Sequence, residues 1–233
     1  MGLKESGLRG SLRSVSTEVG AIPDSEIYLQ DDWGDNRLTN REDSDTTTHN
    51  GVEGIYRPEW TVDAGDVEAQ NEQLEVRDQG ILRADINLNL DETVTWEFSG
   101  VSEETVIDDD GDLVQLGLFS ESDEFTANNR VRFYNDSYLI SIDENANHTE
   151  LLKYDGNERT EIITGSYQGS GSDDVYKVTR TSSGNWELFV NGNSIGTGED
   201  TTYTEPQYTG FAVRQRGGTS NWPELDVDEY KVF

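Results

Sequence analysis

The sequence contains no cysteine, and this absence excludes several kinds of site at once. Without thiols the chain can form no disulfide bond, no thiolate metal centre and no cysteine nucleophile. Long apolar runs are missing too, since no window approaches the roughly 18 apolar residues that a membrane-spanning helix needs. The first residues also lack the apolar core of a signal peptide. We therefore expect a chain with neither a membrane span nor a signal peptide.

Basic residues are scarce. Lys and Arg together number 17 against 48 Asp and Glu, which gives a net charge of −31, and only four of the 17 are lysine. Low hydrophobicity with high charge is typical of disorder, but aromatic residues make up 9% of the chain and strand-like alternation persists. Such an acid-coated domain is typical of extremely halophilic archaea, where molar salt shortens the Debye length to about 3 Å and screens self-repulsion. The same charge argues against nucleic acid as a partner.

Residues 1–27, MGLKESGLRGSLRSVSTEVGAIPDSEI, differ in composition from everything that follows. Basic residues outnumber acidic ones over the first 13 positions, and glycines weaken any helix there. We predict an arm that docks on a partner protein, and the alternative is a tail without fixed structure. This opening resembles the leader of proteins from haloarchaeal tailed viruses and proviruses. The residues expected to mediate assembly are Leu3, Lys4, Leu8, Arg9, Leu12 and Arg13.

Residues 28–233 are expected to form one domain, and residues 174–198 show its pattern most clearly. Val175, Lys177 and Thr179 alternate with Tyr176, Val178 and Arg180 up to a Ser-Ser-Gly-Asn turn, and a second alternating run follows up to Asn191-Gly192. Period-2 alternation broken at such turns predicts antiparallel hairpins. Further strands are predicted at 52–60, 71–76, 81–90, 93–98, 113–119, 130–134, 137–142, 151–154, 161–163, 210–216 and 225–233.

Short strands at this spacing, with no amphipathic helix between them, predict an all-β sandwich or jelly roll. The tryptophans Trp33, Trp60, Trp96 and Trp186 are expected in its core. The order aromatic-x-Val-x-Arg, polar turn, Trp-x-Leu-x-Val-Asn-Gly over 176–192 resembles the laminin-G/concanavalin-A-like domains, as does DDWGDNRLTNRED at 31–43. The resemblance implies a concanavalin-A-like jelly-roll β-sandwich with an extended N-terminal arm. This architecture hosts lectins, glucanases and structural modules, so it does not fix a function.

The segment ELDVDE, from Glu224 to Glu229, offers a possible catalytic pair. It resembles the Glu-x-Asp-x-(x)-Glu strand of laminarinase-type glucanases, in which two carboxylates about 5–5.5 Å apart act as nucleophile and acid/base. In those enzymes the motif lies in the middle of the chain, whereas here only Tyr230–Phe233 follow it. LDVDEYKV also matches the closing strand of laminin-G-like domains. We therefore predict a structural strand, no catalytic residues and no enzyme activity.

A cation site is conceivable in DDDGD, at Asp108, Asp110 and Asp112. The EF-hand spacing fails, because Gly111 precedes the last aspartate and Phe119 stands at the twelfth position. A solvated acidic loop is the default interpretation. A structural Ca²⁺ or Mg²⁺ bound outside an EF-hand is the alternative, and no other cofactor is expected.

Aromatic residues in the late loops are candidates for glycan binding. Trp222 lies in a Gly-rich loop shortly after Arg214 and Arg216, and Tyr203 and Tyr208 lie upstream. Sugar rings stack on aromatic faces, while charged and polar side chains bind the hydroxyl groups. The alternative is that Trp222 packs over the end of the sandwich.

Together these patterns favour a non-enzymatic virion surface protein of a haloarchaeal tailed virus. In this hypothesis the chain forms a homo-oligomer, residues 1–27 bind other virion proteins, and the sandwich contacts glycans or glycoproteins on the host surface. One alternative is a cellular or secreted carbohydrate-binding module. Another is a glucanase that uses Glu224 and Glu229.

Overall fold

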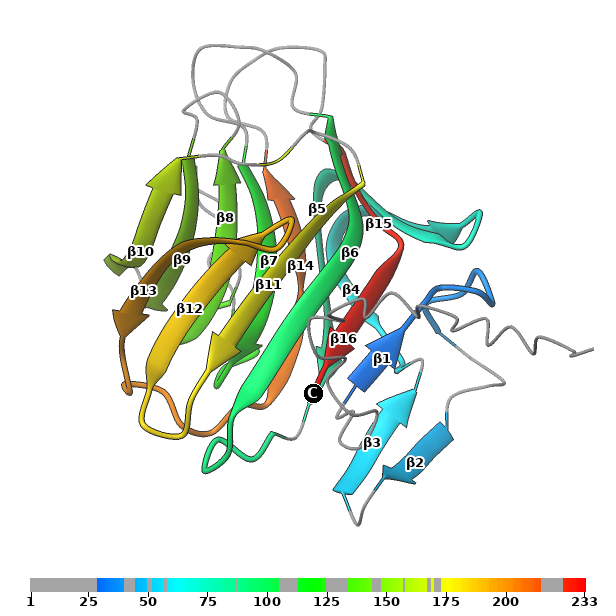
Figure 1. Cartoon of the computed structure of the whole chain (residues 1–233). Coiled ribbons are helices and arrows are strands. Elements are labelled where there is room, and N and C mark those ends of the chain that lie inside the picture. The colour runs from blue at the N-terminus through cyan, green and yellow to red at the C-terminus, as the bar shows by residue number, and fades with distance from the viewer. Residues whose placement is uncertain are drawn as a thin grey trace, which may run out of the picture.

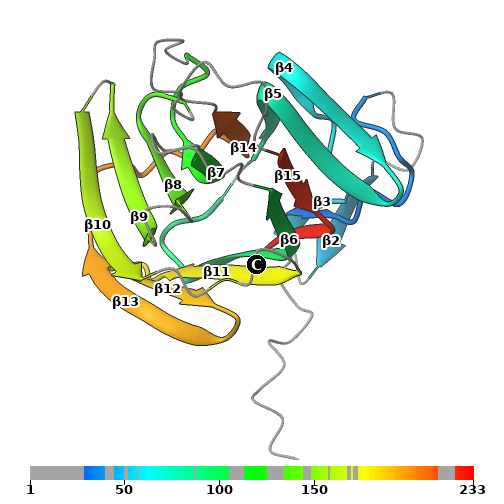
Figure 2. The same ribbon diagram turned by 90° about the horizontal axis from the view of Figure 1, so that it is seen from above.

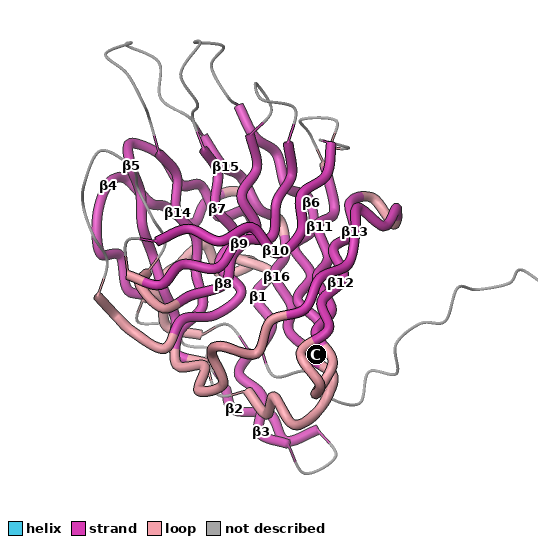
Figure 3. Tube along the Cα trace, turned by 90° about the vertical axis from the view of Figure 1, so that its left-hand side faces the viewer, coloured by secondary structure: helices cyan, strands magenta, loops and turns pink. Residues whose placement is uncertain are grey.

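The computed structural model describes residues 29–39, 45–49, 52–56, 58–86, 88–104, 113–124, 134–143, 148–156, 158–166, 169, 173–214 and 224–233. Within these ranges the chain forms strands and no helix (Figure 3). The predicted all-β class is therefore confirmed. Consistent with this, the described residues include no helix that is long and apolar enough to cross a membrane. Residues 1–27 lie outside these ranges, so the arm and the domain boundary at residue 28 stay predictions.

Among the described residues, strand pairing defines two sheets, and eight strands belong to the first. Figure 1 shows their arrangement. The order of the first sheet is β13 (Asn193–Glu199), β12 (Asn185–Val190), β11 (Asp174–Arg180), β6 (Val94–Glu104), β16 (Glu229–Val232), β1 (Leu29–Asp31), β3 (Val52–Tyr56) and β2 (Asp45–His49). All neighbours are antiparallel except β1 and β3, which run parallel. The short parallel pair lies next to the C-terminal strand.

The second sheet faces the first (Figure 2). Its order is β10 (Glu158–Ser166), β9 (His148–Asp155), β8 (Ser137–Asp143), β7 (Leu113–Ser120), β14 (Tyr208–Arg214) and β5 (Gln73–Asp85). On one side, β5 pairs with β4 (Thr61–Gln70) along most of its length. On the other side it pairs first with β15 (Glu224–Val227) and then with β14.

One long strand, β6, joins the two sheets into a nearly closed sandwich. The first part of β6 pairs with β11 and β16 in the first sheet, whereas Ser102–Glu104 pair with β15 in the second. At the other edge of the sandwich, away from β6 and β15, β10 contacts β13, although the two are not neighbouring strands of one sheet. Glycine permits this approach, because a Cβ on Gly198 would lie 2.6 Å from a side-chain carbon of Ile162. The result is a jelly-roll β-sandwich, as predicted.

The hairpin pattern at 174–198 is confirmed. Every second residue of β11 is buried, and in β12 Trp186, Leu188 and Val190 are buried while their neighbours face outward. Asn191 and Gly192 have φ values of 49° and 77°. Positive φ at both central residues is the requirement of a type I′ turn, whose twist matches that of the strands.

Aromatic rings fill the space between the sheets, and the four tryptophans predicted for the core are all at most 1% exposed. Trp96 stacks on Trp186 with ring centroids 5.8 Å apart, and Tyr138 lies 4.7 Å from the Trp186 ring. Trp33 and Trp60 form a second group, 5.2 Å apart, that contacts Phe211. These rings come from both sheets, so they hold the two layers together.

Asp31 is a buried carboxylate at the centre of the second group, with 0% exposure. Its Oδ2 accepts a hydrogen bond from the indole Nε1 of Trp60 at 2.7 Å, and its Oδ1 accepts one from the backbone NH of Trp33 at 2.9 Å. A buried carboxylate is stable only when its oxygens are hydrogen-bonded. The Asp-Asp-Trp stretch of the sequence therefore ties β1 to the segment before β4.

Several predictions about strands need correction or lie outside the described residues. Segments 71–76 and 81–90 contribute residues 73–76 and 81–85 to one strand, β5, which continues through Gln79 in a left-handed conformation (φ 60°), whereas residues 86 and 88–90 are not in a strand. Of the predicted strand 52–60, β3 ends at Tyr56 and residues 58–60 are not in a strand. The predicted strand 225–233 is interrupted at Asp228, where the chain passes from the second sheet to the first. β4 was not predicted, because an edge strand that faces solvent shows little apolar alternation. Of the predicted strand 130–134, residues 130–133 are not described.

Candidate ligand-binding site

Four strands (β6, β8, β10 and β14) end at one end of the sandwich, the upper end in Figure 1, and the strands that follow them in the chain (β7, β9, β11 and β15) begin there. The connections between them include residues 105–112, 144–147, 167–168, 170–172 and 215–223, which are not described. Arg214, the last residue of β14, stands at this end. The metal candidates Asp108, Asp110 and Asp112 and the glycan candidates Arg216 and Trp222 fall within these connections, outside the described residues.

The other two glycan candidates lie at the opposite end. Tyr203 is only 7% exposed, and its hydroxyl donates to the carbonyl oxygen of Tyr154 at 2.8 Å, so its ring belongs to the core. Tyr208 begins β14, and the Arg83 guanidinium lies 5.0 Å from the centre of its ring. A strand of this length spans about 20 Å, so Tyr208 and Arg214 cannot contact the same monosaccharide.

The structure separates Glu224 and Glu229. Glu224 pairs with Glu104 of β6, whereas Glu229 pairs with Ser99 of the same strand. Five residues of β-strand separate these positions by about 17 Å, far more than the spacing of a retaining glucanase. Glu224 binds Arg77, and Glu229 accepts hydrogen bonds from Gln30 and Lys231. The bend at Asp228 is the cause, and the glucanase alternative for this pair is wrong.

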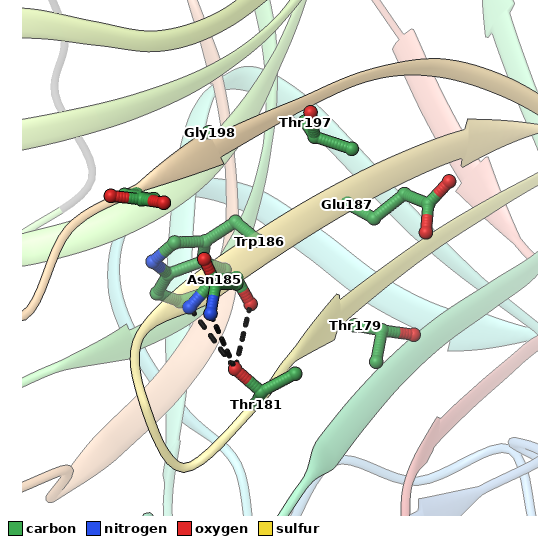
Figure 4. Close-up of a pocket in the computed structure, with 8 residues that line it drawn as sticks. Thr179, Thr181, Asn185, Trp186, Glu187, Thr197 and Gly198 are labelled. Carbon is green, nitrogen blue, oxygen red and sulfur yellow. Dashed lines mark hydrogen bonds between the residues drawn. The ribbon is translucent and has the colours of Figure 1, made fainter.

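A groove of about 480 Å³ lies on the outer face of β11, β12 and β13 (Figure 4). Thr179, Glu187 and Thr197 form a row across the three strands, because they are direct neighbours in the register. Thr179 and Glu187 lie between buried neighbours, and Thr197 is exposed between two glycines, so all three side chains are on the solvent side. The complete lining is Thr179, Thr181, Asn185, Trp186, Glu187, Thr197, Gly198 and Glu199.

Part of the groove is fixed by internal hydrogen bonds. The Oγ1 of Thr181 accepts a hydrogen bond from the backbone NH of Asn185 at 3.1 Å. The Oγ1 of Thr179 lies 3.2 Å from the Oγ1 of Thr95, at hydrogen-bond distance. The Oε1 of Glu187 accepts from Ser194 at 2.8 Å. The other oxygen of Glu187, the Thr197 hydroxyl and the Glu199 carboxylate have no side-chain hydrogen-bond partner within the described residues. These free oxygens can accept hydrogen bonds from a ligand.

The sequence did not reveal this groove. Its members come from three strands, and each is an ordinary solvent-facing residue of an alternating strand. The register of β13 against β12 places Thr197 beside Glu187 and Glu199 beside Asn185. Only that register assembles the site.

A second hollow, of about 690 Å³, lies where three turns meet. The β4–β5 turn contributes Asn71 and Glu72, both with positive φ (54° and 65°). Asp228 at the β15–β16 bend accepts a hydrogen bond from Gln73 at 2.6 Å. The remaining lining residues are Asp32 and Gly34. This hollow is wider and more acidic than the groove.

Acidic side chains also line up across the outer face of β4, β5 and β15. Glu68 is the register neighbour of Glu75, and Glu75 is that of Asp226. One carboxylate oxygen each of Glu75, Glu224 and Asp226 lies within 4.8 Å of the others, a spacing that could hold a cation. Arg77 contacts both Glu75 and Glu224 and so already supplies a positive charge there.

In this row, the environment of Asp226 is unfavourable for an ionised carboxylate. Burial, followed by the charges of Glu224 and Glu75, raises the pKa of Asp226 to about 6. Its Oδ1 is buried and accepts no hydrogen bond from the described residues. The carboxylate form is therefore poorly stabilised in the folded protein.

We expect Asp226→Asn to stabilise the protein at pH 8. The folded-state pKa of about 6 exceeds the ordinary value of 3.8, so ionisation costs stability as the pH rises from about 4 to 6, and the cost persists above pH 6. Because the side chain is partly exposed, the expected gain is about 1 kcal/mol. Urea unfolding at pH 8 and near pH 4 measures it. The gain in the free energy of unfolding should vanish at the lower pH. The exposed control variant, Glu199→Gln, should show no such gain. An equal gain for Asp226→Asn at both pH values would contradict this account.

Comparison with known proteins supports the fold. No family model and no curated protein sequence matches the chain. Among solved structures, the chain is similar to the carbohydrate recognition domain of Emp47p, with a TM-score of 0.60 and 12% identity over 85% of this chain and 92% of that one. The metal-free carbohydrate recognition domain of Emp46p gives a TM-score of 0.57 and 10% identity over 75% and 87% of the two chains.

The chain is also similar to a solved structure of botulinum neurotoxin type C, whose cell entry depends on interaction with two ganglioside molecules. The TM-score is 0.52 with 15% identity, over 82% of this chain and 47% of that one. Identities this low establish the fold alone. The chain therefore has the lectin-type, concanavalin-A-like jelly-roll fold that its sequence predicted.

Proposed function

We propose that the domain is a non-catalytic glycan-binding module that uses the groove on β11, β12 and β13. The observation that carries the proposal is the groove itself, with hydroxyl, amide and carboxylate groups on a rigid sheet. Its volume of about 480 Å³ falls within the range of small-molecule sites, roughly 300–1,000 Å³. The carbohydrate recognition domains that share the fold make a glycan the natural ligand to test.

The rigidity of this surface favours binding. The groove floor is backed by Trp186, whose Nε1 donates to the carbonyl oxygen of Asp200 at 3.0 Å and whose ring packs against Trp96. Side chains on a sheet that is packed in this way lose little further freedom when a ligand binds. Less of the binding free energy is then spent on ordering the site.

Filling the groove should abolish binding. We expect Thr197→Phe to weaken glycan binding at least about tenfold, because a bulky ring would occupy the space over the row. The matched control is Thr160→Phe, at an exposed position of the edge strand β10, which lies outside the groove. Printed glycan arrays followed by calorimetry on the best ligand measure the effect. Equal loss in both variants, or no glycan bound by the parent protein, would refute the proposal.

A non-catalytic module should leave its ligand intact. The absence of a close Glu224–Glu229 pair supports this part of the proposal. Incubation with the bound glycan and with β-glucans should release no new reducing ends. Release of reducing sugar above the buffer control would show that the protein is an enzyme.

The more specific proposal is that the module lies on a virion surface, where residues 1–27 anchor it and glycans of the host surface are its ligand. Support comes from the first 13 residues, in which Lys4, Arg9 and Arg13 outnumber the single acidic residue, Glu5, while the domain that follows is strongly acidic. A cellular carbohydrate-binding module is the alternative setting. Equal incorporation into virus particles of the full chain and of residues 28–233 would refute an anchoring role for the arm.

A further inference from the structure

The groove is built to accept hydrogen bonds and carries negative charge. Its lining includes two carboxylates, Glu187 and Glu199, and no lysine or arginine. Glu187 faces Thr197 across the strand pair, and Glu199 faces Asn185 two residues further along. Diagonal neighbours of this kind lie about 7–8 Å apart, so one ligand in the groove would meet both charges.

Neither carboxylate is neutralised by a described side chain. Glu187 uses one oxygen to accept from the uncharged hydroxyl of Ser194, and Glu199 has no side-chain partner among the described residues. A basic residue on the same face, Lys177, is two positions before Thr179 on β11. Its Nζ lies 5.1 Å from the ring centre of Phe189, beyond the groove lining.

Such a surface discriminates by charge. Carboxylate oxygens accept hydrogen bonds from the hydroxyl groups of a sugar. The ionised carboxylate or sulfate of an acidic sugar has no hydrogen-bond donor to offer them and is repelled by their charge. Like charges placed together at an interface suppress binding of the wrong partner. Because the groove is open to solvent, the repulsion should weaken as salt screens it.

We infer that the groove selects uncharged glycans and rejects acidic ones through Glu187 and Glu199. This inference rests on the proposed glycan-binding function and names the ligand class for the same site. The overall charge of −31 would also repel acidic sugars. The experiment must therefore separate the two local carboxylates from the field of the whole protein.

The test compares N-acetyllactosamine with its sialylated form, and a neutral glucan oligomer with one that contains glucuronic acid. We expect the parent protein to bind the neutral member of each pair at least about tenfold more tightly in low salt. The double variant Glu187→Gln/Glu199→Gln keeps oxygen acceptors but loses both charges. The measured quantity is the ratio of neutral to acidic affinity, and the double variant should reduce that ratio to about threefold or less.

The matched control removes two charges elsewhere. Asp66→Asn/Glu68→Gln changes exposed residues of β4 and alters the net charge by the same amount, so it should leave the discrimination unchanged. Equal discrimination in both double variants would overturn the inference. Tighter binding of the acidic glycans than of the neutral ones by the parent protein would also overturn the inference, particularly if the Lys177→Ala variant lost that tighter binding. If no glycan of any class bound the parent protein, the proposed function itself would fail.

Discussion

Replacing Asp31 with alanine should lower the free energy of unfolding by about 3 kcal/mol. The substitution leaves the indole NH of Trp60 without its acceptor in the core and removes the partner of the Trp33 backbone NH. A buried donor that loses its acceptor costs about 1–3 kcal/mol, and bonds to a charged group are at the upper end. The variant also leaves a void beside the two rings.

The neighbouring residue provides the control. Asp32 follows directly in sequence, but its side chain caps the exposed turn at Gly34. Asp32→Ala should therefore cost less than about 1 kcal/mol. Chemical unfolding followed by tryptophan fluorescence measures both variants, since Trp33 and Trp60 report on this region. Similar losses in the two variants would show that Asp31 does not hold the group together.

Trp186→Ala should have the largest effect, with a loss of about 4 kcal/mol in the free energy of unfolding. The ring is 1% exposed, stacks on Trp96, contacts the tilted ring of Tyr138, and lies beneath the guanidinium of Arg180 at 5.6 Å. Arg180 is itself buried, and burial lowers its pKa. Truncation of Trp186 therefore opens a cavity and removes the ring that covers a buried cation.

Phe189→Ala is the control on the same strand. Phe189 points to the outer face, where it contacts Lys177, and its loss should cost about 1 kcal/mol. Urea unfolding with two spectroscopic probes measures both, and near-ultraviolet circular dichroism shows whether the aromatic packing persists. A loss below about 2 kcal/mol for Trp186→Ala would contradict the central role of the ring.

The hairpins were predictable because their signals are local. Alternation in β11 and β12 and the Asn191-Gly192 dipeptide depend on neighbouring residues alone, and the structure has them where the pattern places them. The burial of the four tryptophans follows from size and apolarity. The edge strand β4 carries no such signal, because a strand that packs weakly on one face needs no apolar alternation.

The functional residues were harder to predict. Tyr203 resembles a ligand-facing aromatic in sequence, but it is enclosed by Tyr138 and Tyr154 from other strands. Glu224 and Glu229 would share a face on a continuous strand, and the bend at Asp228 separates them. In both cases the deciding contact joins residues far apart in the chain, which local patterns do not encode.

The sequence by itself determined the all-β class, the jelly-roll sandwich, the principal hairpins and the aromatic core, because alternation and turn chemistry act over a few residues. The tertiary structure alone decided which solvent-facing side chains meet. The register of β11, β12 and β13 assembles the groove from single residues of three strands. The bend at Asp228, where the chain leaves β15 of the second sheet for β16 of the first, separates the two glutamates along β6. Strand register is a property of the folded pair, set by the burial of one face, and it therefore places Glu187, Thr197 and Glu199 on one surface.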